Sequence, residues 1–396
     1  MEAGVSGTSR RPGGALLFGL ALASLGGPLA LSALYAPGVA GPAVPSVGLA
    51  TLLGAAIFVL PIAVWWRYSE DISSAGGLTA FVHAAAGRRA ALVQGAIWTV
   101  SYFLYLPYTV TFVAYDLLPV VFPGITPYRW LLQLVLPLAA VAVVLAPIAA
   151  LLAVLGAVAL AQLGLLLALG VVELHHVGAP ASSFAVNGGA HAFTRATLGM
   201  SLLFVCGSLP LFLGGEARGG GRAIRLAIAG AFAVAVPYVV FAAFPLAAVP
   251  QSLRGAEIPG YAIASAYAGR PFALAVGLGV IASDATLLLL EFVALSRLLQ
   301  YATGRSVRRT TLWIAVPFVA ADALGLIDPE TFYARTITPS LAALWLSQLL
   351  VFVAYPLYRR RRRERLTGLD LGLAASSAAL FAWGFYLVAS GQAGGS

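Results

Sequence analysis

Membrane-length apolar segments recur along the whole chain of 396 residues. A transmembrane helix needs about 20 consecutive, mainly apolar residues. Windows of that kind predict spans at 15–40, 46–66, 91–119, 130–150, 151–176, 197–215, 223–249, 271–303, 311–327, 336–358 and 369–391. Only 9% of the residues are charged, whereas soluble domains carry about 25%. We therefore expect an all-α membrane protein with about 11 transmembrane helices and no separate soluble domain.

Two of these segments are interrupted at matching places in the two halves of the chain. The first contains the stretch 26–38 (GGPLALSALYAPG), and the second contains 206–215 (CGSLPLFLGG). Lipid cannot replace the backbone hydrogen bonds lost at such breaks, so the freed groups must face protein, water or a ligand. A matched pair of interrupted helices predicts a substrate site near the middle of the membrane in a secondary transporter.

The basic residues, all 23 of which are arginines, predict the orientation. They are concentrated in the loops on one side of the membrane. With the N-terminus inside, only five lie outside: Arg129, Arg195, Arg254, Arg270 and Arg335. The positive-inside rule then predicts a multi-pass protein of the cytoplasmic (inner) membrane with its N-terminus inside. Eleven spans place the C-terminus outside. The net charge of +9 follows this topology and does not indicate a nucleic-acid partner.

The region 65–108 carries a characteristic series of residues: Tyr68, Glu70, Gly76, Gly77, Phe81, Gly87, Gly95 and Trp98. This series resembles the second and third helices of permeases of the amino acid–polyamine–organocation (APC) superfamily. The stretches 215–222 and 296–299 resemble the ends of the sixth and eighth helices of that superfamily. An apolar piece at 258–268, which is too short to span the membrane, precedes helix eight as the resemblance requires.

The resemblance implies the leucine-transporter-type fold, in which two inverted repeats of five helices each (5+5) form the core. The core would cover 15–363, with repeat one at about 15–176 and repeat two at about 197–358. Residues 1–14 would form a cytoplasmic tail, and 369–391 an additional C-terminal helix. Helices one and six would be broken. Apolar residues at helical spacing also predict a short interfacial helix at 78–86.

The resemblance places candidate substrate-binding residues at both breaks. In helix one they are Ala30, Leu31, Ser32 and Ala33, where exposed N–H groups would bind a substrate carboxylate. Leu31 adds bulk there, and the triplet contains no glycine to supply positive φ angles. In helix six Cys206, Gly207, Ser208 and Leu209 would present backbone and small side chains.

Tyr102 and Tyr105 of helix three are further candidate substrate contacts. They belong to an aromatic row at helical spacing that begins at Trp98. Such a row either packs against a neighbouring helix or lines the site, where a buried tyrosine hydroxyl needs a partner.

Ser283 and Asp284 are the candidate coupling residues, because they lie about halfway along the span 271–303. An ionisable residue at that depth costs about 2.5–3.5 kcal/mol to insert and is paired, hydrated or functional. The resemblance implies that this part of helix eight faces the break of helix one, so Asp284 either binds Na⁺ with Ser283 and first-helix carbonyls, or takes up a proton, or makes a structural hydrogen bond. Glu291 on the same helix face either relays protons or pairs with Arg297, and we favour the pairing.

These features predict a secondary active transporter of an amino acid or related amine, working by alternating access and coupled to H⁺ or Na⁺. The alternatives are an uncoupled amino acid exchanger and a membrane sensor that does not transport its substrate. A small neutral amino acid is preferred as substrate, with a cationic one left open. No group of residues predicts catalysis, a resident metal or a cofactor, so we expect no enzyme; the oligomeric state is left undefined.

Overall fold

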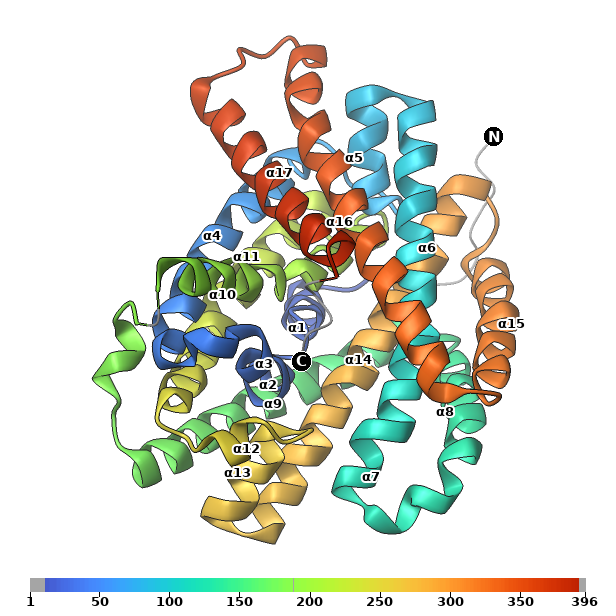
Figure 1. Cartoon of the computed structure of the whole chain (residues 1–396). Coiled ribbons are helices and arrows are strands. Elements are labelled where there is room, and N and C mark those ends of the chain that lie inside the picture. The colour runs from blue at the N-terminus through green and yellow to red at the C-terminus, as the bar shows by residue number, and fades with distance from the viewer. Residues whose placement is uncertain (1–10, 188, 392–396) are drawn as a thin grey trace.

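The computed structural model describes residues 11–187 and 189–391, and the regular elements of this part of the chain are all helical (Figure 1). The first half contains α1 (Gly14–Ser24), α2 (Pro28–Ala30), the π-helical turn η1 (Leu31–Tyr35), α3 (Ala36–Ala40), η2 (Gly41–Ser46), α4 (Val47–Tyr68), α5 (Gly77–Ala86), α6 (Arg88–Phe112), η3 (Val113–Leu117), α7 (Leu118–Val121), η4 (Pro123–Tyr128), α8 (Arg129–Val144), α9 (Ile148–Val177) and η5 (Ala181–Phe184). The second half contains α10 (Ala190–Leu202), the 3₁₀ helix η6 (Val205–Leu213), α11 (Gly220–Ala243), η7 (Phe244–Ala247), α12 (Gln251–Arg254), α13 (Pro259–Ala268), α14 (Arg270–Thr303), α15 (Val307–Gly325), α16 (Pro329–Arg361) and α17 (Gly368–Ala389). Most of the predicted tail, residues 1–10, lies outside the described part.

Each of the predicted spans has a helical counterpart. Within the described residues, nine segments are long and apolar enough to cross a membrane, and the first of them, Gly14–Tyr68, contains two spans separated by the 3₁₀ turn η2. The helix α15 adds another span, although its Arg308, Arg309 and Asp322 lower its apolar character. The predicted boundary between spans four and five is wrong by a few residues. Pro147 sets it earlier, because the residue before a proline avoids the α conformation.

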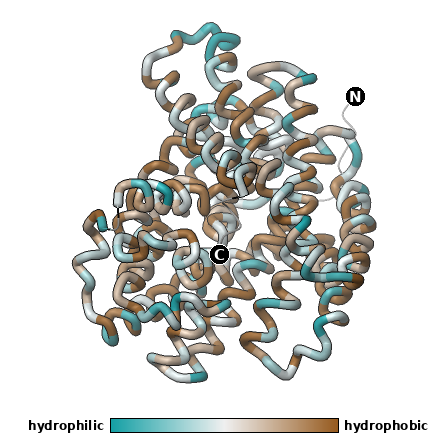
Figure 2. Tube along the Cα trace, viewed as in Figure 1, coloured by the Kyte–Doolittle hydropathy of each residue, from teal (hydrophilic) through white to brown (hydrophobic). Residues whose placement is uncertain are grey.

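Polar residues gather at the two ends of the helix bundle, and apolar residues fill the middle (Figure 2). One end holds the turns between α5 and α6 and between α16 and α17 (Figure 1). We call it the arginine-rich end, because it includes Arg88, Arg89 and Arg359–Arg363. The opposite end holds α13, so we call it the α13 end. This distribution of polar residues suits a protein whose middle lies in hydrocarbon.

The interrupted helix α1 lies inside the bundle, where it contacts α9, α11 and α14. It approaches α9 closely, since a Cβ added at Gly19 would lie 2.8 Å from the Cα of Gly156. Small residues at such a crossing let two helices pack tightly, which matters in a membrane because lipid tails compete with apolar side chains. The other interrupted element, η6, contacts α1 and α14 as well. Packing therefore brings the two breaks together in the core.

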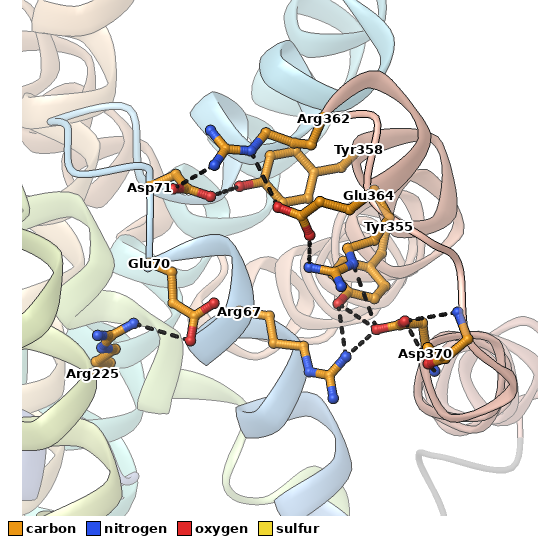
Figure 3. Close-up of polar contacts among 11 residues, drawn as sticks. Arg67, Glu70, Asp71, Arg225, Tyr355, Tyr358, Arg362, Glu364 and Asp370 are labelled. Carbon is orange, nitrogen blue, oxygen red and sulfur yellow. Dashed lines mark hydrogen bonds and ion pairs between the residues drawn. The ribbon is translucent and has the colours of Figure 1, made fainter.

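The last helix, α17, is fixed to the core by Asp370 at the arginine-rich end (Figure 3). The Asp370 side chain is fully buried and forms an ion pair with Arg67 of α4. It also accepts hydrogen bonds from Tyr355 Oη of α16 (3.0 Å) and from the Thr367 hydroxyl (2.6 Å). One carboxylate therefore joins three helices.

A second carboxylate holds the other side of α16. Asp71, in the turn after α4, accepts hydrogen bonds from Tyr358 Oη (2.6 Å) and from the Arg362 guanidinium (2.9 Å) (Figure 3). Its neighbour Glu70 forms an ion pair with Arg225 of α11 at 3.4 Å. The turn after α4 therefore connects α4 to both α16 and α11.

We expect Asp370→Ala to lower the free energy of unfolding by about 3 kcal/mol, because the change removes one partner of a buried ion pair. Thermal unfolding in detergent, followed by tryptophan fluorescence, measures the effect. Asp71→Ala is the control, since Asp71 and Arg362 are both about one-third or more exposed and such pairs contribute less than about 1 kcal/mol. Equal destabilisation by the two variants would contradict the role assigned to Asp370.

Candidate functional site

Two glycines open the break of helix one. The helix α1 ends at Ser24, α2 starts at Pro28, and Gly26 and Gly27 between them have φ angles of 84° and 68°. Only glycine adopts such angles readily. Within the described residues, the backbone N–H groups of Gly26, Gly27, Leu29 and Ala30 have no backbone acceptor. Free N–H groups at the start of a helix attract anions, because the helix dipole adds to them.

The register predicted for this break is wrong by four residues, since the break begins at Gly26 and not at Ala30. Ala30 ends α2, and Leu31, Ser32 and Ala33 lie in the π-helical turn η1. The physical reason is the positive φ angle, which the glycines supply and which Ala30, Leu31 and Ser32 would resist. The Leu31 side chain folds back towards Gly26, with its Cδ2 atom 3.2 Å from the position of an added Cβ.

Ser32 and Ala33 take part in helix packing. The Ser32 hydroxyl donates a hydrogen bond to the carbonyl oxygen of Val239 in α11 (3.2 Å). A Cβ added at Gly260 of α13 would lie 2.5 Å from the Ala33 Cβ, so α13 rests directly on η1. The turn η1 thereby connects the first break to the α13 end.

The break of helix six lies where the sequence predicts it. The helix α10 ends at Leu202, and the chain continues as the 3₁₀ helix η6, which includes Cys206, Gly207, Ser208 and Leu209. A 3₁₀ run of nine residues is unusually long, and such segments often mark hinges. The Ser208 hydroxyl donates to the Val205 carbonyl (3.1 Å) and accepts from Gln348 of α16 (3.2 Å).

The two breaks touch each other. A Cβ added at Gly26 would lie 3.3 Å from the carbonyl oxygen of Leu203, which follows α10. A Cβ added at Gly207 would lie 3.0 Å from the Leu25 side chain. The backbone groups left without helical hydrogen bonds at the two breaks therefore lie next to each other.

Ser283 and Asp284 of α14 lie beside the first break. A Cβ added at Gly27 would lie only 2.4 Å from the Ser283 Cβ. The Asp284 side chain is buried, and its Oδ1 accepts a hydrogen bond from Tyr35 Oη of η1 at 2.7 Å. Its Oδ2 has no hydrogen-bond partner among the described residues. The structure thus leaves half of this carboxylate available.

Tyr35 is the site residue that sequence reasoning missed. It stands within the interrupted stretch 26–38, as its only aromatic residue and one of its two side chains that carry a hydroxyl group. A tyrosine hydroxyl needs a partner when buried, and that requirement was the available signal.

The helix α6 contributes its tyrosines from another side. Tyr102 is buried, stacks on Trp98 with 4.1 Å between ring centroids, and directs its hydroxyl to Cys206 Sγ at 3.9 Å. The Tyr105 ring lies against Tyr108, with 5.2 Å between centroids. Tyr102 therefore reaches the second break, and Tyr105 lies one helical turn further along the same helix.

The predicted pairing of Glu291 with Arg297 is wrong. Arg297 instead binds Glu216, with its Nε and Nη2 atoms 3.0 and 3.4 Å from the two carboxylate oxygens. The reason is helical geometry, because side chains meet at spacings of three or four residues and not at six. The Arg297–Glu216 pair joins α14 to the segment after η6, on the side of the breaks that faces the arginine-rich end.

No protein-family model and no curated protein matches the sequence. Solved structures do match. MhsT in complex with L-phenylalanine has a TM-score of 0.61 at 14% identity, covering 94% of this chain and 98% of that one. A manganese transporter of Eremococcus coleocola has a TM-score of 0.59 at 10% identity, covering 100% and 90%. A Na⁺-coupled sialic acid symporter in a substrate-bound outward-open state has a TM-score of 0.58 at 9% identity, covering 96% and 90%.

These similarities establish the fold. The chain has the leucine-transporter-type architecture with about 11 membrane helices, and helices one and six are broken, as predicted. Identities this low show the fold alone. The narrower resemblance to the amino acid–polyamine–organocation superfamily therefore stays a prediction.

Proposed function

We propose that the protein is a secondary active transporter of an amino acid or related amine in the cytoplasmic membrane, coupled to H⁺ or Na⁺. One observation carries the proposal. The breaks of helices one and six touch each other beside Asp284, a buried carboxylate with one unpartnered oxygen. Broken helices and an intramembrane acid are the parts from which midplane transport sites are built.

The first break would hold the carboxylate of an amino acid. Its N–H groups at Gly26 and Gly27 lack backbone acceptors in the described chain, and the start of α2 adds a positive partial charge. The second break would contribute Cys206 and Gly207, whose small size leaves the backbone accessible. Tyr102 would close the site from α6, through its contact with Cys206.

Asp284 would carry the coupling cation. Its free oxygen could take a proton, or bind Na⁺ together with Ser283 and carbonyl oxygens of helix one, all of which are hard oxygen ligands. Either ion would neutralise the buried carboxylate. Tyr35 of η1 binds the other oxygen of Asp284, and α13 packs on η1. Binding of the coupling cation to Asp284 would therefore change the contacts of η1 and, through it, the position of α13.

Contacts on both sides of the breaks would serve as gates for alternating access. By the positive-inside rule the arginine-rich end faces the cytoplasm. The Arg297–Glu216 pair then lies on the cytoplasmic side, and the contact of α13 with Ala33 lies on the outer side. Substrate passage requires each contact to open in turn.

Uptake by liposomes tests the proposal. Purified protein is reconstituted, and labelled amino acids and amines are offered under a pH gradient, a sodium gradient or neither. Uptake driven by one gradient identifies the coupling ion, and exchange without a gradient identifies an uncoupled exchanger. Binding without uptake identifies a sensor. Exchange without a gradient, or binding without uptake, would each overturn the proposal of a coupled transporter.

The only cysteine of the chain provides a second test, because Cys206 lies at the second break. A bound substrate should cover it. We expect a transported amino acid to slow the reaction of Cys206 with a small methanethiosulfonate at least several-fold, as measured by mass spectrometry. An amino acid that is transported without slowing this reaction would contradict the placement of the site.

We expect Tyr35→Phe to reduce the uptake rate by roughly tenfold or more, because a hydrogen bond to a charged group contributes about 1.5–3 kcal/mol. Tyr108→Phe is the matched control. It removes a tyrosine–tyrosine hydrogen bond of 3.0 Å between Tyr108 and Tyr333, and neutral bonds contribute about 0.5–1.5 kcal/mol. Comparable initial rates in the two variants would show that the Asp284 contact has no special role.

A further inference from the structure

The structure contains a second buried carboxylate near the breaks that the proposed coupling does not use. Glu291 of α14 is 1% exposed, and its Oε2 has no hydrogen-bond partner among the described residues. An ionised carboxylate in this environment costs several kcal/mol unless a positive group compensates it. Glu291 must therefore either hold a proton or pair with a positive group.

No described residue supplies that partner. The sequence contains no lysine, and the arginine nearest to Glu291 along α14, Arg297, is committed to Glu216. None of the ion pairs of the described residues includes Glu291, and its Oε2 accepts no hydrogen bond from them. When Glu291 is ionised, its positive partner must therefore come from a bound molecule.

Glu291 faces the proposed substrate site. It lies seven residues from Asp284, on nearly the same face of α14. Tyr102 and Tyr105 belong to α6, and Cys206 belongs to η6. Helix α14 packs against both α6 and η6. Glu291 thus lies on nearly the same helix face as Asp284, in the helix that packs against the second break.

The charges of the site are complementary to a particular kind of molecule. The first break offers N–H donors to a carboxylate, and Asp284 takes the coupling cation. Glu291 remains as an acceptor without a donor. A guanidinium or ammonium group would satisfy it, and hydrogen bonds between such ions and a carboxylate are among the strongest in proteins.

We propose that the substrate carries a positively charged side group that pairs with Glu291, as in a cationic amino acid or a related amine. This inference rests on the proposed transport function and replaces the preference for a neutral substrate. Asp284, the residue singled out in the sequence, is then the coupling group, and Glu291 is the group that selects the substrate.

Matched pairs of amino acids test the inference with the full-length protein in liposomes. L-arginine and L-citrulline have nearly the same shape, and L-lysine differs from L-norleucine by its terminal ammonium group. Only arginine and lysine carry a positively charged side chain. Uptake and protection of Cys206 are measured for all four. We expect arginine or lysine to bind at least tenfold more tightly than its neutral counterpart.

Variants test whether Glu291 causes the preference for positively charged amino acids. Glu291→Gln should abolish the discrimination between charged and neutral partners, and Glu291→Asp should retain part of it. Glu173→Gln is the control, because Glu173 of α9 is equally buried with an unpartnered oxygen but lies one turn from His176, whose ring stacks on Tyr267 of α13. It should leave the preference unchanged. Thermal unfolding confirms that each variant is folded.

The outcomes separate this inference from the proposed function. Uptake of citrulline or norleucine that equals or exceeds that of the charged partner would overturn the cationic substrate and leave a transporter. A cationic preference that persists in folded Glu291→Gln would overturn the role of Glu291. If neither the four amino acids nor the wider set of amines binds or is taken up, both proposals fail. If Glu291→Gln does not fold, the wild-type comparison and Glu291→Asp decide.

Discussion

Asp284→Asn is expected to abolish gradient-driven uptake, lowering the initial rate by at least about a hundredfold. The variant loses the buried negative charge that would pair with the coupling cation, and breaking a buried charge pair costs about 3–5 kcal/mol. Asparagine has the same shape as aspartate and can still accept the hydrogen bond of Tyr35 Oη, which lies 2.7 Å from Oδ1 in the wild type. It can neither take a proton nor offer a negative charge to Na⁺. The variant thus separates coupling from packing.

The control for this experiment is Asp322→Asn. Asp322 of α15 is also fully buried, and its Oδ2 is also unpartnered among the described residues. It lies away from the breaks, beside Gln133 of α8, whose side-chain nitrogen is 3.3 Å from Asp322 Oδ1. We expect near wild-type coupling in this variant. If Asp284→Asn liposomes respond to the same gradient as the wild type, Asp284 is structural and the coupling proposal is wrong.

Gly27→Ala is expected to lower the free energy of unfolding by about 2–5 kcal/mol and to eliminate uptake, because overpacking and a positive φ angle each add to the cost. The new Cβ would lie 2.4 Å from the Ser283 Cβ and 2.7 Å from its hydroxyl oxygen. Helix one would have to move away from α14. Thermal unfolding and uptake in parallel measure the two consequences.

Gly269→Ala separates the clash from the backbone cost. Gly269 precedes α14 and also has a positive φ angle (81°), but a Cβ added there would meet nothing within 4 Å. The Gly269→Ala variant should lose stability only because alanine resists a positive φ angle, and its uptake should be unchanged. Equal losses in the two variants would mean that the contact of Gly27 with Ser283 does not hold the break in place.

The membrane spans and the presence of two broken helices could be predicted from local sequence. Hydropathy adds up along a segment, so the spans and the helices α5 and α13 follow from their own residues. Asp284 stands out for the same reason, because any acid in the middle of an apolar span costs free energy wherever its neighbours lie. The predicted position of the first break was wrong, because the stretch 26–38 contains several small residues and two prolines at which a helix could be interrupted.

The sequence by itself determined an all-α membrane protein with two broken helices and an acid at mid-depth. Only the tertiary structure decided which groups meet there. Tyr35 and Asp284 are 249 positions apart, and Glu216 and Arg297 are 81 apart. Hydrogen bonds and ion pairs need distances near 3 Å, which only the packing of distant helices can set. That packing placed Gly27 against Ser283 and left Glu291 without a partner.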